Sequence, residues 1–296
     1  MRKVFTITAN LLSEYTLQLE SSKVPTKGTH RAVSTSHQVG GKGINVSRAL
    51  NSLGQANIAI CLPAGKEGEK CVESLKAESV DIAPIYIEGE TRIASVIRTN
   101  NANKEVSYFS TDINPSSSDF KKIITYIEKN AKKGDIIAIC GSIPNFKDSF
   151  GESLLELVEK KALSLCVDTY GKALKFFSDK KLLLLKINKD ELLGLELLNK
   201  NDKTKDNFLA LAKISKANFL AITNGAKPAL LYADNIATKH KVRKVKLKSA
   251  TGCGDLTFAY MINAILNGAV SIRQAFEASL EYATNTAIKK EENAHI

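Results

Sequence analysis

Apolar and polar positions follow two different patterns along the chain. Short continuous apolar runs, such as residues 136–140, predict buried strands, and apolar residues at helical spacing follow most of them. Further buried strands are expected at 4–9, 57–62, 163–167, 182–187 and 219–223, with helices from Gly43 to Gly54 and over 67–79, 148–161 and 189–198. Apolar strands that alternate with helices predict an α/β fold: a doubly wound, mostly parallel sheet with helices on both faces.

A second pattern occurs in the first third of the chain. Residues 15–19 alternate between apolar and polar side chains, which is typical of a half-buried strand, and residues 92–99 and 106–110 belong to a β-rich patch with turns. Such strands fit poorly in a sheet that is covered on both faces. We therefore expect one domain over residues 1–296, with a small separate sheet that caps one edge and is built from insertions near 11–38 and 84–110.

A glycine-rich stretch, Ala-Thr-Gly-Cys-Gly-Asp at 250–255, lies between an alternating segment at 245–248 and a helix that stops near Asn267-Gly268. Unpaired N–H groups and the dipole at a helix start favour an anion. The carboxylate of Asp255 would be repelled by that anion. Its place is explained if it accepts a proton from a hydroxyl beside the anion, as the base of a phosphoryl-transfer enzyme does. The alternative is an Asp N-cap with glycines in a tight turn.

A second glycine-rich helix start is Gly-Gly-Lys-Gly-Ile-Asn at 40–45. It is not a Walker A loop, because Gly43 follows Lys42 where Ser or Thr should stand. Nor do Gly252 and Gly254 complete a Rossmann fingerprint. Lys42 adds a positive charge to the backbone donors, and Asn45 can hydrogen-bond a hydroxyl. Two such helix starts in one chain suit an enzyme that binds two phosphorylated molecules.

Composition and charge exclude several other classes of protein. The net charge is +11, from 42 basic and 31 acidic residues, but the lysines lie among acidic residues and no aromatic residues interleave with them, so no nucleic-acid partner is expected. No apolar stretch approaches the roughly 20 residues of a membrane span. The five cysteines form no CxxC pair and the four histidines no cluster, which predicts a cytoplasmic protein with reduced thiols and no zinc site.

The chain resembles the ribokinase-like (PfkB-type) carbohydrate kinases, closest to the branch with 1-phosphofructokinase and tagatose-6-phosphate kinase. Gly-Gly-Lys-Gly-Ile-Asn-Val-Ser-Arg-Ala-Leu at 40–50 matches the N-terminal signature of that branch, and residues 251–255 resemble its C-terminal signature. The likeness extends to 91–93, 141–144, 168–169, 186–192 and 223–226. It implies a Rossmann-like fold with a small β lid, ATP and Mg²⁺ as cofactors, and a homodimer through the lid.

The resemblance also implies roles for individual residues. Asp255 would deprotonate the attacking sugar hydroxyl beside an anion hole formed by the backbone amides of Gly252, Cys253 and Gly254. Lys42 and Arg92 would hold the phosphate already on the sugar, and Glu191 would organise Mg²⁺ through water. The implied substrate contacts are Glu14, Arg31, Gly41, Lys42, Asn45 and Arg92, and the implied nucleotide contacts are Asn188, Glu191, Thr223, Gly225, Gly254 and Asn285.

Two positions that bear on substrate choice depart from the family's pattern. Glu14 stands where the family has Asp, and Ala94 where this branch often has Asn. We expect an ATP-dependent kinase that acts on a phosphorylated ketohexose, with fructose 1-phosphate as first choice. Tagatose 6-phosphate is the alternative substrate, and an unphosphorylated sugar or nucleoside comes third. A sugar-phosphate-binding regulator without catalysis is the alternative from a different class.

Overall fold

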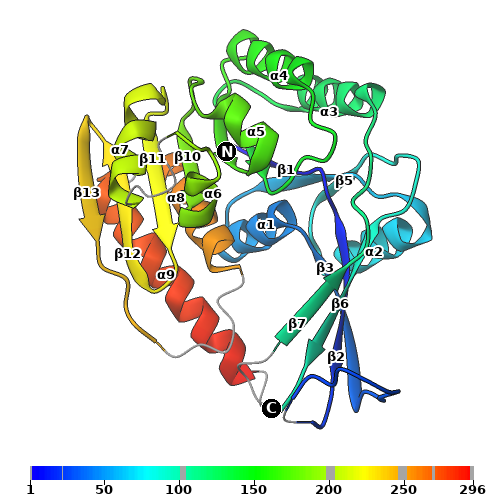
Figure 1. Cartoon of the computed structure of the whole chain (residues 1–296). Helices are drawn as coiled ribbons and strands as arrows, with labels where there is room; N and C mark the ends of the chain where they lie inside the picture. The colour runs from blue at the N-terminus through cyan, green and yellow to red at the C-terminus, as the bar shows by residue number, and fades with distance from the viewer. Residues whose placement is uncertain are drawn as a thin grey trace.

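The computed structural model describes residues 2–21, 23–100, 105–197, 204–245, 252–268 and 271–293, and within them two sheets are formed (Figure 1). The larger has the strand order β13-β12-β11-β10-β9-β8-β1-β4-β5. Neighbours run parallel from β11 to β5, whereas β12 and β13 are antiparallel. The strands are β1 (Val4–Thr8), β4 (Asn57–Cys61), β5 (Ile82–Pro84), β8 (Ile136–Cys140), β9 (Ser164–Asp168), β10 (Leu184–Asn188), β11 (Phe219–Asn224), β12 (Lys227–Ala233) and β13 (Ile236–His240).

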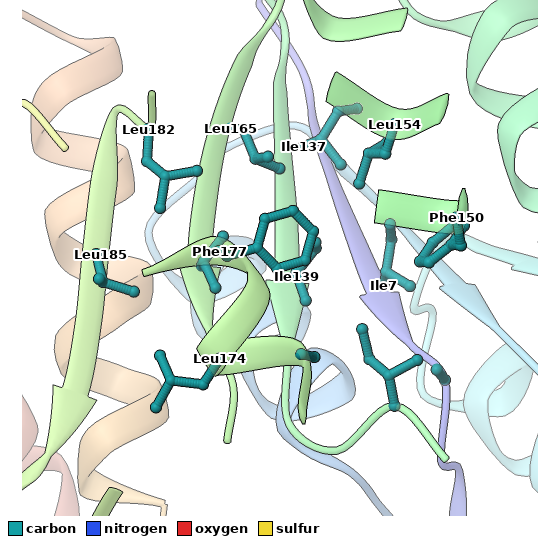
Figure 2. Packing of buried hydrophobic residues seen from close by; sticks show 14 of the residues in the cluster. Ile7, Ile137, Ile139, Phe150, Leu154, Leu165, Leu174, Phe177, Leu182 and Leu185 are labelled. Atoms are coloured by element: carbon teal, nitrogen blue, oxygen red, sulfur yellow. The ribbon is translucent and has the colours of Figure 1, made fainter. Parts of the chain in front are cut away.

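Helices cover both faces of this sheet. On one face, Ile137 and Ile139 of β8 pack in a core with Phe150, Leu154 and Phe177 (Figure 2). The alternate residues of the same strand face the helices α1, α8 and α9, which explains its unbroken apolar run. The helices are α1 (Lys42–Ser52), α2 (Gly65–Ala77), α3 (Ser117–Asn130), α4 (Asp148–Lys160), α5 (Gly171–Phe177), α6 (Lys189–Leu193), α7 (Thr204–Ile214), α8 (Cys253–Leu266) and α9 (Ile272–Asn293). None in the described part of the chain is long and apolar enough to span a bilayer.

The smaller sheet has the order β3-β2-β6-β7 and projects from the body of the molecule (Figure 1). Its strands are β2 (Leu12–Gln18), β3 (Ser34–Gly40), β6 (Arg92–Arg98) and β7 (Glu105–Phe109). On one face, Ser13 Oγ and Tyr15 OH donate to the carboxylate of Glu67 in α2, at 2.7 and 3.0 Å. Because successive strand residues point to opposite faces, Glu14 and Arg92 lie on the other face.

The predicted fold class is confirmed: a mostly parallel α/β sheet with helices on both faces, plus a small second sheet. Sequence reasoning gave no range for the helices α3, α5, α7 and α9, although α3 carries Phe120, Ile123 and Ile127 at helical spacing. It also missed the hairpin of β12 and β13, whose two-residue turn Asp234-Asn235 has φ of 53° and 60°, as a type I′ turn requires.

Two predicted elements differ in extent. The helix expected over 189–198 ends after Leu193, where the chain turns at Gly194, and residues 198–203 lie outside the described part. Of the strand expected at 245–248, Val245 is not in a strand, and residues 246–251 are outside the described ranges. That gap includes Ala250 and Thr251 of the second glycine-rich stretch.

Candidate active site

The candidate site lies along the carboxyl ends of the parallel strands. Strands β1 and β8 are neighbours, and the chain leaves β1 toward β4 on one side and β8 toward β9 on the other. Such a switch point opens a crevice at the strand ends. Asn10, two residues after β1, donates from Nδ2 to Ser142 Oγ, two residues after β8, at 2.9 Å. Asp168 ends β9, Asn188 ends β10, and Thr223 on β11 pairs with Asn188, so these residues form a row.

The two glycine-rich helix starts meet at this crevice. Helix α1 begins after Gly41 (φ 115°) and α8 after Gly252 (φ 86°), and both backbones have the positive φ that glycine adopts more readily than other residues. Asn45 Nδ2 in α1 donates to Asp255 Oδ2 in α8 at 2.8 Å. The N-cap of α8 is Gly252, so Asp255 is not the cap that the alternative interpretation required. Its carboxylate points instead toward the other helix start.

Asp255 is almost fully buried, with 5% of its surface exposed. Burial raises the pKa of Asp255 to about 6, and the negative charge of Asp168 adds to this, while Asn45, Lys186 and Lys42 act in the opposite direction. A carboxyl with such a pKa is still ionised at pH 7 but is more basic than an exposed aspartate. It is therefore suited to accept a proton from an alcohol.

Four charged side chains form a network beside Asp255. Lys42 Nζ donates to Asp168 Oδ1 and to Glu191 Oε1, both at 2.8 Å, and Lys186 Nζ donates to Asp168 Oδ2 at 2.6 Å. Burial by itself would raise the pKa of Asp168, but Lys186 and Lys42 outweigh it and hold that pKa below its usual value. Likewise, burial would lower the pKa of Lys42, but Asp168 and Glu191 raise it. Two charges of each sign balance inside the network.

Lys186 and Asp168 are functional candidates that sequence reasoning did not select. A Cβ placed on Gly254 would lie 2.7 Å from Lys186 Nζ, so this ammonium group lies directly against the first turn of α8. The signal was a lysine inside the apolar run at 182–187, because a buried lysine needs a partner. That partner is Asp168, with 1% of its side chain exposed.

Asn188 and Glu191 form a capping box at the start of α6. Asn188 Oδ1 accepts from the Glu191 N–H at 2.9 Å, and Glu191 Oε2 accepts from the Asn188 N–H at 2.8 Å. With Lys42 on Oε1, both carboxylate oxygens of Glu191 are engaged. A divalent cation therefore fits at Glu191 through water better than by direct ligation. Within the described residues, no three His, Cys, Asp or Glu side chains group as a metal site.

A second polar cluster surrounds Arg92. Its Nη1 lies 3.3 Å from Asp112 Oδ1, its Nη2 3.4 Å from the carbonyl oxygen of Asn10, and its buried Nε has no hydrogen-bond partner within the described part of the chain. Asp112 Oδ1 also accepts from Asn10 Nδ2 at 2.8 Å. The cluster joins the end of β1 to the small sheet. The guanidinium group of Arg92 therefore has N–H donors left that can bind an anion.

Comparison with known proteins identifies the family. The model of the pfkB family of carbohydrate kinases matches residues 5–290. The chain belongs to the pfkB family. Its likeness to the 1-phosphofructokinase of Bacillus subtilis is 26% identity over 292 residues, covering 97% of this chain and 93% of that protein. The 1-phosphofructokinase of Borreliella burgdorferi is 27% identical over 293 residues, which cover 97% of this chain and 92% of that protein. The family predicted from the glycine-rich segments is confirmed.

Solved structures of phosphofructokinase-2 from Escherichia coli share the fold of this kinase. The tetrameric inhibited form has a TM-score of 0.87 at 22% identity and covers 97% of this chain and 95% of that chain. The complex with fructose-6-phosphate has a TM-score of 0.86 at 22% identity, covering 98% and 95%. At these identities the likeness concerns the fold.

Three of the remaining predicted residues of this pfkB family kinase lie on segments other than the two helix starts. Glu14 lies next to Ala94 in the small sheet and accepts from Gln38 Nε2. Gly225 is an exposed turn residue after β11. Asn285 is exposed on α9 and accepts from Arg243.

Arg31 is not brought together with Gly41 within one chain. It is exposed and precedes β3, whereas Gly41 follows the other end of that strand. A strand of seven residues spans about 20 Å. An arginine at that end of the small sheet is therefore separated from Lys42 and Arg92.

Proposed function

We propose that this kinase transfers the γ-phosphoryl group of ATP to fructose 1-phosphate, giving fructose 1,6-bisphosphate and ADP. The observation that carries the proposal is the hydrogen bond from Asn45 to Asp255, because it joins the base to the other helix start. Two relatives that match nearly the whole chain are named 1-phosphofructokinase, which favours this substrate.

The chemistry follows from the groups around Asp255. The carboxylate takes the proton of the sugar hydroxyl, whose oxygen forms a bond to the γ-phosphorus as the bond to ADP breaks. The backbone N–H groups of Gly252, Cys253 and Gly254 at the start of α8 stabilise the transferring phosphoryl group. Lys186 adds a positive charge beside Gly254. Asn45 orients the carboxylate and contacts the sugar beside Gly41.

The nucleotide would lie along the ends of β10 and β11. Its phosphates would meet Asn188, Glu191, Thr223 and Gly225, and Asn285 would lie at the edge of the adenine. Mg²⁺, organised through water by Glu191, neutralises phosphate charge when bound. The contact of Lys42 with Glu191 supports a place for Lys42 on this side.

The phosphate already on the sugar is then assigned chiefly to Arg92. Its buried Nε, unpartnered among the described residues, and its long contacts leave donors for an anion, and Glu14 lies on the same face of the small sheet to meet sugar hydroxyls. Lys42 would complete this subsite only by giving up a carboxylate partner.

A substrate panel tests the proposal. ATP consumption is measured with Mg²⁺ and fructose 1-phosphate, fructose 6-phosphate, tagatose 6-phosphate or fructose. We expect the highest kcat/KM with fructose 1-phosphate. A higher value with tagatose 6-phosphate would reassign the substrate. Saturable binding of a sugar phosphate without turnover on any of the four would favour the regulator.

The pH dependence of turnover tests the base. Only ionised Asp255 can accept the proton, so we expect kcat to fall about tenfold per pH unit below about 6. A sugar phosphate itself titrates near pH 6, so kcat at saturating substrate is the quantity to follow from pH 5 to 8. A kcat that stays constant down to pH 5 would contradict the role of Asp255.

The small sheet is also the proposed contact of a homodimer. Tyr108 and Phe109 on its edge strand β7 are 61% and 56% exposed, and a second copy would cover them. Sedimentation of the wild type and of Tyr108→Glu should give a dimer and a monomer, respectively. A wild-type monomer at micromolar concentration would exclude this contact.

A further inference from the structure

Arg92 and Asp112 form an open ion pair at the crevice end of the small sheet. The arginine side chain is 16% exposed and the aspartate 54%. Asp112 follows β7 in the segment that leads to α3, so it lies where the small sheet joins the body of the molecule. Its Oδ1 is shared between Arg92 Nη1 at 3.3 Å and Asn10 Nδ2 at 2.8 Å.

The guanidinium group of Arg92 lies over the ring of Phe109, 5.6 Å from its centroid, but its hydrogen bonds hold it weakly. Its two hydrogen bonds are long, and its buried Nε has no partner among the described residues, although an arginine carries five N–H donors. Arg98, at the other end of the same strand, differs: its Nε donates to Glu105 Oε2 at 2.7 Å. Two arginines of one strand thus have a loose and a tight carboxylate partner.

Asp112 itself is fixed by a contact that does not involve Arg92. Asn10 Nδ2 donates one hydrogen to Asp112 and the other to Ser142 Oγ at 2.9 Å. The Asn10 side chain is buried, so this anchor holds the carboxylate in place even when the arginine moves. An anion that binds Arg92 therefore meets a negative charge that stays beside it.

We propose that Asp112 occupies Arg92 as an internal anion, which the phosphate of the substrate has to displace. This inference deepens the proposed function, since it assigns Arg92 to the phosphate already on the sugar. A phosphate offers several charged oxygens to the guanidinium fork and displaces a single long contact. A neutral sugar hydroxyl does not displace Asp112 from Arg92. Asp112 thereby weakens the binding of the phosphate that Arg92 receives.

The expected effect of Asp112→Asn follows from the ion pair that the phosphate otherwise has to break. Releasing Arg92 from a partly exposed ion pair changes a binding constant at most about fivefold. Asp112→Asn keeps an oxygen that accepts from Asn10 Nδ2, so this variant removes the charge and retains the shape. The matched control is Glu105→Gln, which removes the carboxylate partner of Arg98 on the same two strands.

The experiment measures two quantities with the full chain. The first is the Kd of inorganic phosphate, by calorimetry with Mg-ADP present to occupy the nucleotide side, and the second is the KM of fructose 1-phosphate with Mg-ATP. We expect Asp112→Asn to lower both by up to about fivefold and Glu105→Gln to leave both unchanged. A KM or Kd that is unchanged or higher in Asp112→Asn would overturn the proposal, because Asp112 would then orient Arg92 rather than compete for it.

A double-mutant cycle locates the effect. In the Arg92→Gln background, Asp112→Asn should no longer change the Kd of inorganic phosphate. If it still tightens phosphate binding there, the effect does not pass through Arg92 and the proposal fails. If no variant turns over fructose 1-phosphate but the fivefold change in phosphate binding remains, the proposed substrate fails and the inference about Asp112 stands.

Discussion

Replacing Asp255 by Asn should reduce kcat at least about a hundredfold while the protein stays folded, because the amide cannot take the proton of the attacking hydroxyl. The substitution keeps an oxygen that can accept from Asn45, so the junction of the two helix starts is retained. Steady-state kinetics with the purified variant measures the loss, and circular dichroism checks the fold.

The matched control is Asp135→Asn. Asp135 is also buried, but it accepts from the backbone N–H groups of Lys3 and Lys132, both at 2.8 Å, away from the candidate site. We expect turnover per folded molecule to be retained in that variant. Turnover of wild-type order in Asp255→Asn would refute the role of Asp255 and with it the proposed mechanism.

Asp255→Asn should also increase the free energy of unfolding, by an amount that depends on the pH. The pKa of Asp255 is raised in the folded state to about 6, so the folded state of the wild type loses stability as the pH rises from about 4 through 6 and this carboxyl ionises. Two pKa units correspond to at most about 3 kcal/mol. Asp255→Asn should therefore unfold at higher urea concentration than the wild type at pH 8, with little difference at pH 4. Equal stability at both pH values would contradict the raised pKa.

Replacing Asp168 by Asn should lower the free energy of unfolding by about 3–5 kcal/mol, the cost expected when one partner of a buried ion pair is removed. Lys186, with 2% of its side chain exposed, has only Asp168 as an ion-pair partner among the described residues. The lowered pKa of Asp168 means that its contribution is present above about pH 4 and is lost as the carboxylate protonates in acid. Urea unfolding at pH 7 measures the change.

Two further variants test whether the destabilisation by Asp168→Asn comes from breaking a buried ion pair. Glu128→Gln removes the partner of Lys160 in a pair whose side chains are 49% and 72% exposed, so it should destabilise the protein far less than Asp168→Asn does. The double variant Asp168→Asn/Lys186→Met should be less destabilised than Asp168→Asn alone, because it leaves no unpaired ammonium group buried beside the new amide. A cost below about 1 kcal/mol for Asp168→Asn would show that the network is not needed for the fold.

Local pattern in the sequence was sufficient for much of the fold. Continuous apolar runs such as 136–140 indicate strands that are buried on both faces, and the two glycine-rich helix starts were recognised together with Asp255 and Lys42. The helix α3 and the turn at Asp234-Asn235 carried readable local signals that were missed. For these elements, the information lies within a few consecutive residues, where backbone geometry and side-chain period are decided.

The sequence by itself determined the family, the parallel sheet and the helix starts that carry the base. Only the tertiary structure decided the partners of the charged residues: Lys42 with Asp168 and Glu191, and Arg92 with Asp112. The physical reason is that these contacts join the ends of different strands and loops. Strand order, sheet packing and the position of the small sheet bring such ends together, and none of these is encoded in the local spacing of residue types.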